Sequence, residues 1–162
     1  EHAHPLAKEL LRRVECSLLW RSQVLRLNLL YVRGGAALAM LEQGLGERAV
    51  LLREVTRDAR AIERERVPWM QPFARVLRAG IALRDGDTRA ALYELDVAFR
   101  QYEAHDLNAY AWATQDRAIR LGQDPMAVAH LARLAQKWKA ERVCAPASIM
   151  RLLVPGLLRG PS

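Results

Sequence analysis

Residues 77–99, LRAGIALRDGDTRAALYELDVAF, constrain the fold most strongly, because two amphipathic segments meet there at a polar turn. The turn is centred on Gly86, and alanines lie seven residues before it and five and twelve residues after it, at Ala79, Ala91 and Ala98. Small side chains at these positions would let two helices approach closely along one seam. The pattern therefore predicts an antiparallel helical hairpin.

The same spacing recurs around Gly44, with Ala37 before the turn and Ala49 and Thr56 after it. The two turns are 42 residues apart, which is longer than the roughly 34-residue period of tetratricopeptide repeats. A third turn near Gly122 matches only in part, as a terminal capping repeat can. The chain is therefore expected to contain a short array of related hairpins.

The fold class predicted from these patterns is all-α, with antiparallel hairpins stacked as a tetratricopeptide-like α-solenoid. Alternation of apolar and polar residues with period two never persists for four positions, so no strand is expected. We expect one domain over residues 1–156 and a loose tail over residues 157–162. Seven helices and a short terminal one are expected at about 5–15, 17–41, 47–65, 69–84, 88–103, 106–121, 125–141 and 148–153.

Several boundaries depend on particular residues. Ser17, Asp106 and Asp124 are the expected N-caps of the helices that follow them. Paired glycines at Gly34 and Gly35 leave two alternatives open: one long helix in which a neighbouring helix approaches closely, or a break into two helices. The chain begins with glutamate rather than methionine, so we expect it to be a piece of a longer protein.

The net charge of +7 raises nucleic acid or an anionic membrane surface as possible partners. Nearly all of the 25 basic residues are arginines spread along the chain, without interleaved aromatic residues. Solvated arginine faces are therefore the first interpretation, with the glutamates Glu47 and Glu54 expected beside them in solvent. The alternative hypothesis is a nucleic-acid-binding module whose contacts come from one arginine-rich helix, through Arg53, Arg57, Arg60 and Arg64.

The cysteines and histidines of the sequence do not form a recognisable catalytic or metal-binding motif. Cys16 and Cys144 lack metal-ligand spacing and are expected to be half-buried, reduced thiols of a cytoplasmic protein. His2 and His4 are expected in a disordered end, and the remaining histidines at helix junctions or on the surface. The longest apolar run, residues 36–41, is far shorter than a membrane span. No enzymatic activity, metal or cofactor is predicted for this chain.

The spacing of small residues around Gly86 resembles that of a degenerate tetratricopeptide hairpin. A narrower likeness covers nearly the whole chain and rests on LRAGIALRDGD, DLNAYAWATQDRAIRLGQ and QKWKAERVCAPASIMRLLVPGLL. These segments resemble the tetratricopeptide-like C-terminal region of large bacterial serine/threonine protein kinases and related signalling ATPases, especially from myxobacteria. The closing elements of that region correspond here to Trp138, Pro146, Met150, Pro155 and Gly156.

The resemblance implies a non-catalytic sensory or docking region attached to an effector domain. Its hairpins would stack into a right-handed curve, and a peptide or partner protein would lie on the concave face lined by the first helix of each hairpin. Trp112 with Tyr110 is expected to help line this groove. The partner-binding candidates are Leu38, Leu41, Glu42, Phe73, Val76, Leu83, Arg84, Trp112 and Gln115.

Overall fold

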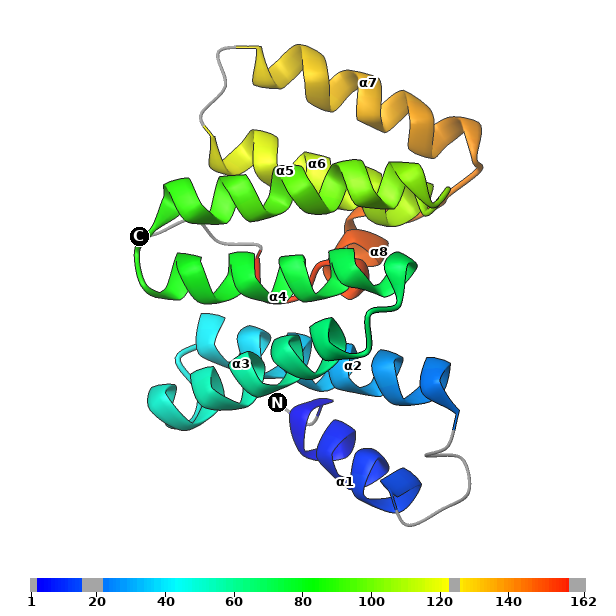
Figure 1. Cartoon of the computed structure of the whole chain (residues 1–162). Helices are drawn as coiled ribbons and strands as arrows, with labels where there is room; N and C mark the ends of the chain where they lie inside the picture. The colour runs from blue at the N-terminus through cyan, green and yellow to red at the C-terminus, as the bar shows by residue number, and fades with distance from the viewer. Residues whose placement is uncertain (1–2, 16–21, 123–125, 158–162) are drawn as a thin grey trace.

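The computed structural model describes residues 3–15, 22–122 and 126–157 (Figure 1). These residues form eight α-helices, one short 3-10 helix and no strand, which confirms the all-α class and the helix count. The elements are α1 (Ala3–Glu15), α2 (Gln23–Glu42), α3 (Arg48–Arg64), η2 (Pro68–Met70), α4 (Gln71–Arg84), α5 (Thr88–Ala104), α6 (Asn108–Leu121), α7 (Ala127–Ala140) and α8 (Pro146–Leu153).

From α1 to α7 consecutive helices pack against each other, and from α2 to α7 each runs back along the one before it (Figure 1). Helix α2 also contacts α4, so the first helices of two successive hairpins are neighbours. Helix α1 lies at one end of the stack and α7 at the other. The short α8 departs from this order, because it folds back onto α6 rather than extending the stack.

The turn of the predicted central hairpin has the expected chemistry. Helix α4 ends at Arg84 and α5 begins at Thr88. Gly86 between them has a φ of 80°, a left-handed conformation that glycine adopts without steric cost. The Asp87 side chain caps α5 by accepting a hydrogen bond from the backbone N–H of Ala90 at 2.8 Å. This hairpin is therefore confirmed.

The alanine seam is complete in the central hairpin and partial in the one before it. Ala79, Ala91 and Ala98 are all fully buried where α4 and α5 meet. In the preceding hairpin Ala37 is fully buried, but Ala49 is exposed on α3. The repeat spacing thus predicts the seam of the α4–α5 hairpin well. In the α2–α3 hairpin it predicts the buried alanine of α2 but not the exposed Ala49 of α3.

Helix α2 is continuous through Gly34 and Gly35, which decides between the two alternatives. A Cβ at Gly34 would lie 3.0 Å from Leu77 Cδ1, and a Cβ at Gly35 would collide with the Pro155 ring. The glycines therefore make room for α4 on one side and for the end of the chain on the other. Among the described helices, α2 alone has the length and composition of a membrane span, and here its apolar residues form part of the core.

Other boundaries differ from the predictions. Leu107 rather than Asp106 precedes α6, and Asp106 itself has a positive φ of 57°. Ser17, Asp124 and Cys16 lie outside the described residues, and Cys144 is exposed rather than half-buried. The predicted loose tail was wrong at its first residue, because Leu157 is fully buried, and the rest of that tail lies outside the described residues.

Candidate functional site

Three of the predicted partner-binding residues are not accessible. Leu38 and Val76 have 0% of their surface exposed and Phe73 has 3%, so their prediction as surface contacts was wrong. Phe73 is instead the centre of an aromatic cluster, with its ring 4.9 Å from that of Tyr31 and 4.8 Å from that of Tyr110. Tyr110 is half-buried and packs against the core through this cluster.

The remaining predicted contacts are half-buried: Leu41, Glu42, Leu83, Arg84, Trp112 and Gln115. Trp112 packs edge to face on Trp138, with ring centroids 5.3 Å apart, and Lys137 Nζ lies 5.7 Å from the Trp112 ring centre. Its indole is thus held within the α6–α7 pair by contacts that contribute to stability.

A later segment of the chain contacts two helices of the predicted concave face, α2 and α4. The Tyr31 hydroxyl donates a hydrogen bond to the carbonyl oxygen of Leu153 at 2.5 Å, and Arg84 Nη2 donates to that of Gly156 at 2.8 Å. These bonds connect α2 and α4 to residues more than 70 positions later in the chain. Sequence periodicity could not reveal this, because it reports which helix face is apolar and not which distant segment covers it.

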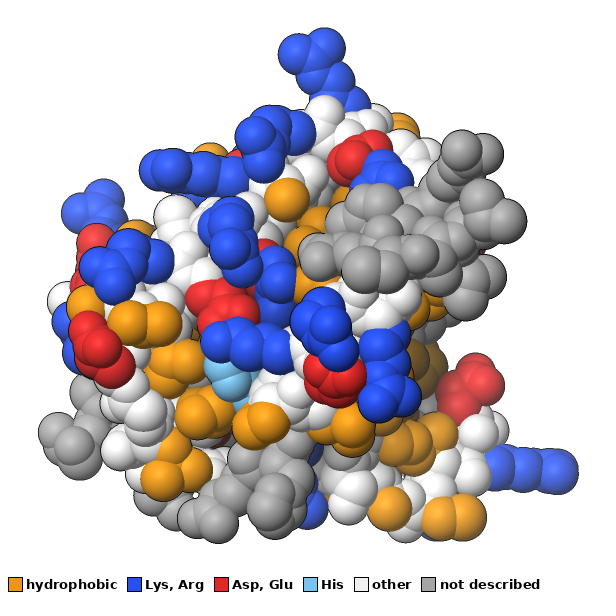
Figure 2. Space-filling model, turned by 90° about the horizontal axis from the view of Figure 1, so that it is seen from below, with side chains coloured by type: hydrophobic (Ala, Val, Ile, Leu, Met, Phe, Trp, Pro, Cys, Tyr) orange, Lys and Arg blue, Asp and Glu red, His pale blue; other side chains and the backbone are white. Residues whose placement is uncertain are grey.

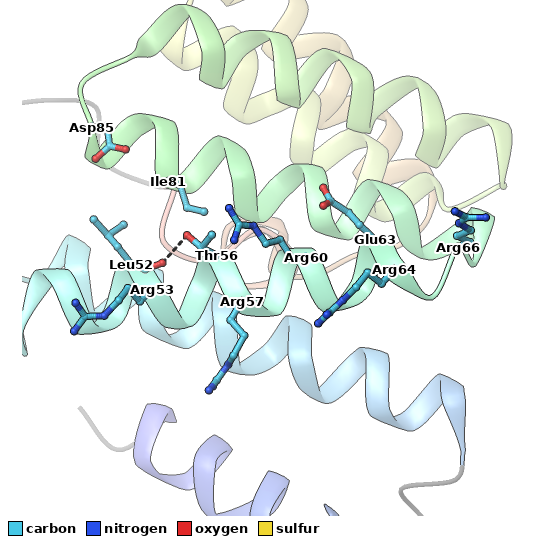
Figure 3. A pocket seen from close by; sticks show the side chains of 10 residues that line it. All are labelled: Leu52, Arg53, Thr56, Arg57, Arg60, Glu63, Arg64, Arg66, Ile81 and Asp85. Atoms are coloured by element: carbon cyan, nitrogen blue, oxygen red, sulfur yellow. Dashed lines mark hydrogen bonds between the residues drawn. The ribbon is translucent and has the colours of Figure 1, made fainter.

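One exposed charged feature is a row of four arginines on α3. Arg53, Arg57, Arg60 and Arg64 are all exposed, and their spacing of four, three and four residues places them on one face of the helix. Figure 3 shows Arg60 projecting toward α4 and Arg57 toward α1. We call these four residues the α3 arginine stripe. The sequence had identified the same four residues as candidates for nucleic-acid binding.

Beside the stripe lies an open groove of about 870 Å³ between α3 and α4 (Figure 3). Its lining includes the apolar side chains of Leu52 and Ile81, with Thr56 between them on the α3 side. The Thr56 hydroxyl donates to the carbonyl oxygen of Leu52 at 2.7 Å, so its polar group is already satisfied. The groove thus combines a basic margin with a partly apolar floor.

The acidic residues that line the groove are already engaged. Asp85 pairs with Arg48 at 2.9 Å, and Glu63 accepts two hydrogen bonds from Arg78, at 2.5 and 2.6 Å. Within the described residues no ion pair within 4 Å involves three of the stripe's arginines. The exception, Arg57, lies 3.8 Å from Asp58. The stripe therefore keeps most of its positive charge available to solvent, and Figure 2 shows Lys and Arg side chains spread over the face viewed from below.

Neutralising Glu63 should have a pH-dependent effect on stability. Hydrogen bonds from Arg78 hold the pKa of the Glu63 carboxyl below its ordinary value. A carboxyl group whose pKa is lowered by folding stabilises the folded state at every pH above its unfolded-state pKa. This contribution is lost as the pH falls through the folded-state pKa. Glu63→Gln should therefore cost about 0.5–1 kcal/mol at pH 7 and less at pH 3. Urea unfolding at both pH values tests this, with exposed Glu103→Gln as control; equal costs at both would contradict it.

A buried charge cluster lies beneath the arginine stripe. Arg33 from the middle of α2 forms a bidentate pair with Asp58 of α3, and one of its two hydrogen bonds measures 2.9 Å. Arg33 Nε also lies 3.5 Å from Glu54 Oε1. Burial raises the pKa of the Asp58 carboxyl, and the hydrogen bond from Arg33 opposes that shift. The cluster therefore ties α2 to α3 through charges that solvent does not reach.

Two predictions failed at this cluster. Glu54 was expected in solvent and is buried, and His4 was expected in a disordered end and is buried on α1. His4 Nε2 lies 3.1 Å from Glu54 Oε2, and Lys8 Nζ lies 2.9 Å from the same oxygen. Glu54 thus joins α1 to α3. Its distance of 50 residues from His4 in sequence leaves no local signal of the contact.

Comparisons with models of protein families, with curated proteins and with solved structures found no match to this chain.

Proposed function

We propose that this chain is a non-catalytic protein-interaction module with regulatory function, built as a tetratricopeptide-like α-solenoid. The repeated antiparallel packing, the contact between α2 and α4 and the buried alanine seam support this assignment. The resemblance to C-terminal regions of bacterial kinases and signalling ATPases supports a cytoplasmic signalling protein as its context. An effector domain in the same parent protein would then be controlled by what this module binds.

The α3 arginine stripe and its groove form the binding surface in this proposal. The observation that carries it is the alignment of four exposed arginines along a groove with apolar side chains in its lining. From Arg53 to Arg64 the stripe covers about 16 Å at the rise of an α-helix. Arginine is favoured at interfaces because its planar guanidinium pairs with carboxylates in a defined geometry.

The partner chemistry that fits this surface is an acidic amphipathic helix. Glutamates spaced four, three and four residues apart on such a helix would face the four arginines, while an apolar residue between them would enter the groove near Leu52 and Ile81. Opposite charges would speed association and set the register, and the apolar contact would slow dissociation. The partner is therefore a protein segment that carries both kinds of residue.

Nucleic acid is the weaker alternative for the same surface. The residues that line the groove include no aromatic side chain on which a base could stack. They do include two carboxylates, Glu63 and Asp85, which would lie close to a polyanion. A helix with separate acidic residues can avoid these two positions, whereas a continuous phosphate backbone cannot.

Removing the charge of the stripe should weaken peptide binding at least tenfold. The probe is a fluorescently labelled helical peptide with four glutamates at the spacing above and one central leucine. Fluorescence anisotropy would compare the unaltered protein with the variant Arg53→Gln, Arg57→Gln, Arg60→Gln and Arg64→Gln. Each lost pair at this exposed surface contributes about 0.2–1 kcal/mol, so four pairs at a middle value of about 0.5 kcal/mol give about 2 kcal/mol, more than the about 1.4 kcal/mol of a tenfold loss.

The matched control lowers the net charge equally at four exposed arginines away from the groove: Arg89→Gln, Arg100→Gln, Arg120→Gln and Arg133→Gln. This variant should bind the peptide within threefold of the unaltered protein. An equal loss in both variants would show that only net charge attracts the peptide, and the proposed surface would be wrong. Tighter binding of a 20-nucleotide single strand, with a steep dependence on salt, would instead establish the nucleic-acid alternative.

A further inference from the structure

The C-terminal segment, residues 146–157, lies against the inner face formed by α2, α4 and α6. Two of its contacts with α2 and α4 are hydrogen bonds to its backbone: Tyr31 donates to the Leu153 carbonyl and Arg84 donates to the Gly156 carbonyl. Donors on a folded surface that bind carbonyl groups of an irregular segment are typical of peptide recognition, because they depend little on the segment's side chains. The hydrogen bonds that the inner face donates to this segment are therefore of the kind that a bound peptide would receive.

The segment is held more firmly by the residues after its helix than by the helix itself, whose Ile149, Met150 and Leu153 are half-buried against the core. No residue of α8 is fully buried, and Leu152 has 76% of its surface exposed. Beyond the helix, Val154 and Leu157 are buried in the core. A hollow of about 360 Å³ separates parts of α8 from α6. The helix is therefore loosely packed, and four residues after it provide the anchor.

Gly156 lies so close to α2 that any other residue at this position would displace the α2 backbone. Its φ is 71°, and a Cβ there would lie 2.6 Å from the carbonyl carbon of Leu38 and 2.8 Å from the nitrogen of Ala39. The neighbouring Pro155 ring occupies the space above Gly35. The backbone of α2 and the Pro155–Gly156 pair are therefore complementary in shape.

We propose that residues 146–157 are a displaceable intramolecular ligand, and that the inner face is a peptide-binding groove that this segment occupies. The groove accepts a short amphipathic helix followed by Val-Pro-Gly-Leu, so the same segment from a second copy fits it equally. This site is distinct from the α3 arginine stripe and does not depend on it. Displacement of the segment would uncover Leu38, which Gly156 contacts, and Arg84, which binds the Gly156 carbonyl.

The first test cuts the connection without removing the segment. A recognition sequence for a site-specific protease is inserted in the full chain between the exposed residues Cys144 and Ala145. After cleavage the fragment should stay bound during gel filtration, and a labelled synthetic peptide of residues 145–157 should replace it within hours. Unfolding of the body when the fragment leaves, or no exchange at excess peptide, would show that the segment is an integral part of the core.

The second test compares two glycines that share a left-handed backbone. Gly156→Ala should increase hydrogen exchange in α8 at least tenfold, because the new methyl group meets the α2 backbone. Gly44→Ala is the matched control, since Gly44 has a φ of 70° and a Cβ added there would meet no atom within 4 Å. Equal hydrogen-exchange rates in α8 of the two variants would overturn the proposal. So would a Gly156→Ala variant in which α8 loses protection only when the whole protein does.

Discussion

Replacing Phe73 with alanine should lower the free energy of unfolding by about 3–5 kcal/mol, the usual cost of removing a buried phenylalanine. The Phe73 ring contacts three tyrosines, Tyr31, Tyr102 and Tyr110, each edge to face with centroids 4.8–5.1 Å apart. These residues come from α2, α5 and α6, so a single cavity would weaken three helix contacts of α4. Urea unfolding followed by circular dichroism gives the change in free energy.

Phe99→Ala is the control for this prediction, because Phe99 is only half-buried against the same core. Its cost should be clearly smaller, since less apolar surface is lost. The sequence had assigned Phe73 to partner binding, and the two roles predict different results. If Phe73→Ala left the unfolding midpoint unchanged but abolished binding of a partner, the structural role described here would be wrong.

The sequence predicted local features of the fold correctly where a single helix or turn determines them. The alanine spacing identified the hairpin of α4 and α5, and Asp87 was within the predicted turn and caps α5. For the paired glycines of α2 the sequence left two alternatives open, and the structure selects the close approach, with Leu77 and Pro155 as the neighbours. Helix periodicity and turn residues are local signals, so one sequence is enough to interpret them.

The candidate site was predicted less well, for a physical reason. A helix inside a stack is covered on more than one side, so an apolar residue such as Val76 gives no indication of which side remains open. The cover itself comes from residues 146–157, far along the chain from α2 and α4. The α3 arginine stripe was easier to find, because its spacing on one exposed helix is a local property.

Helix α4 contributes to both surfaces proposed here. Ile81 lines the groove beside the arginine stripe, and Arg84, three residues later, holds the carbonyl of Gly156 on the inner face. Asp85 at the end of the same helix pairs with Arg48 of α3. A partner helix in the groove would therefore contact the helix that retains the C-terminal segment. Measuring exchange of the 145–157 peptide with and without the acidic peptide would show whether the two sites are coupled.

Replacing Asp58 with alanine should cost about 3–5 kcal/mol, because it leaves the Arg33 guanidinium buried without its bidentate partner. Asp58 has none of its surface exposed, and Arg33 is buried in the middle of α2. Glu54 remains 3.5 Å from Arg33 Nε, so we expect a value toward the lower end of this range. Urea unfolding at pH 7 measures the loss. Asp96→Ala is the matched control, because its ion pair with Arg100 is exposed on α5 and should contribute less than about 1 kcal/mol.

A second substitution distinguishes the loss of the pair from the loss of packing. In the double variant Arg33→Met and Asp58→Leu both charges are replaced by apolar groups, and such replacements are often neutral or stabilising. The double variant should therefore recover most of the stability lost in Asp58→Ala, although Glu54 would then depend on His4 and Lys8 for its pairing. If the double variant is as unstable as Asp58→Ala, the cost comes from the packing of α2 against α3. In that case the buried pair would not be what makes Asp58 important.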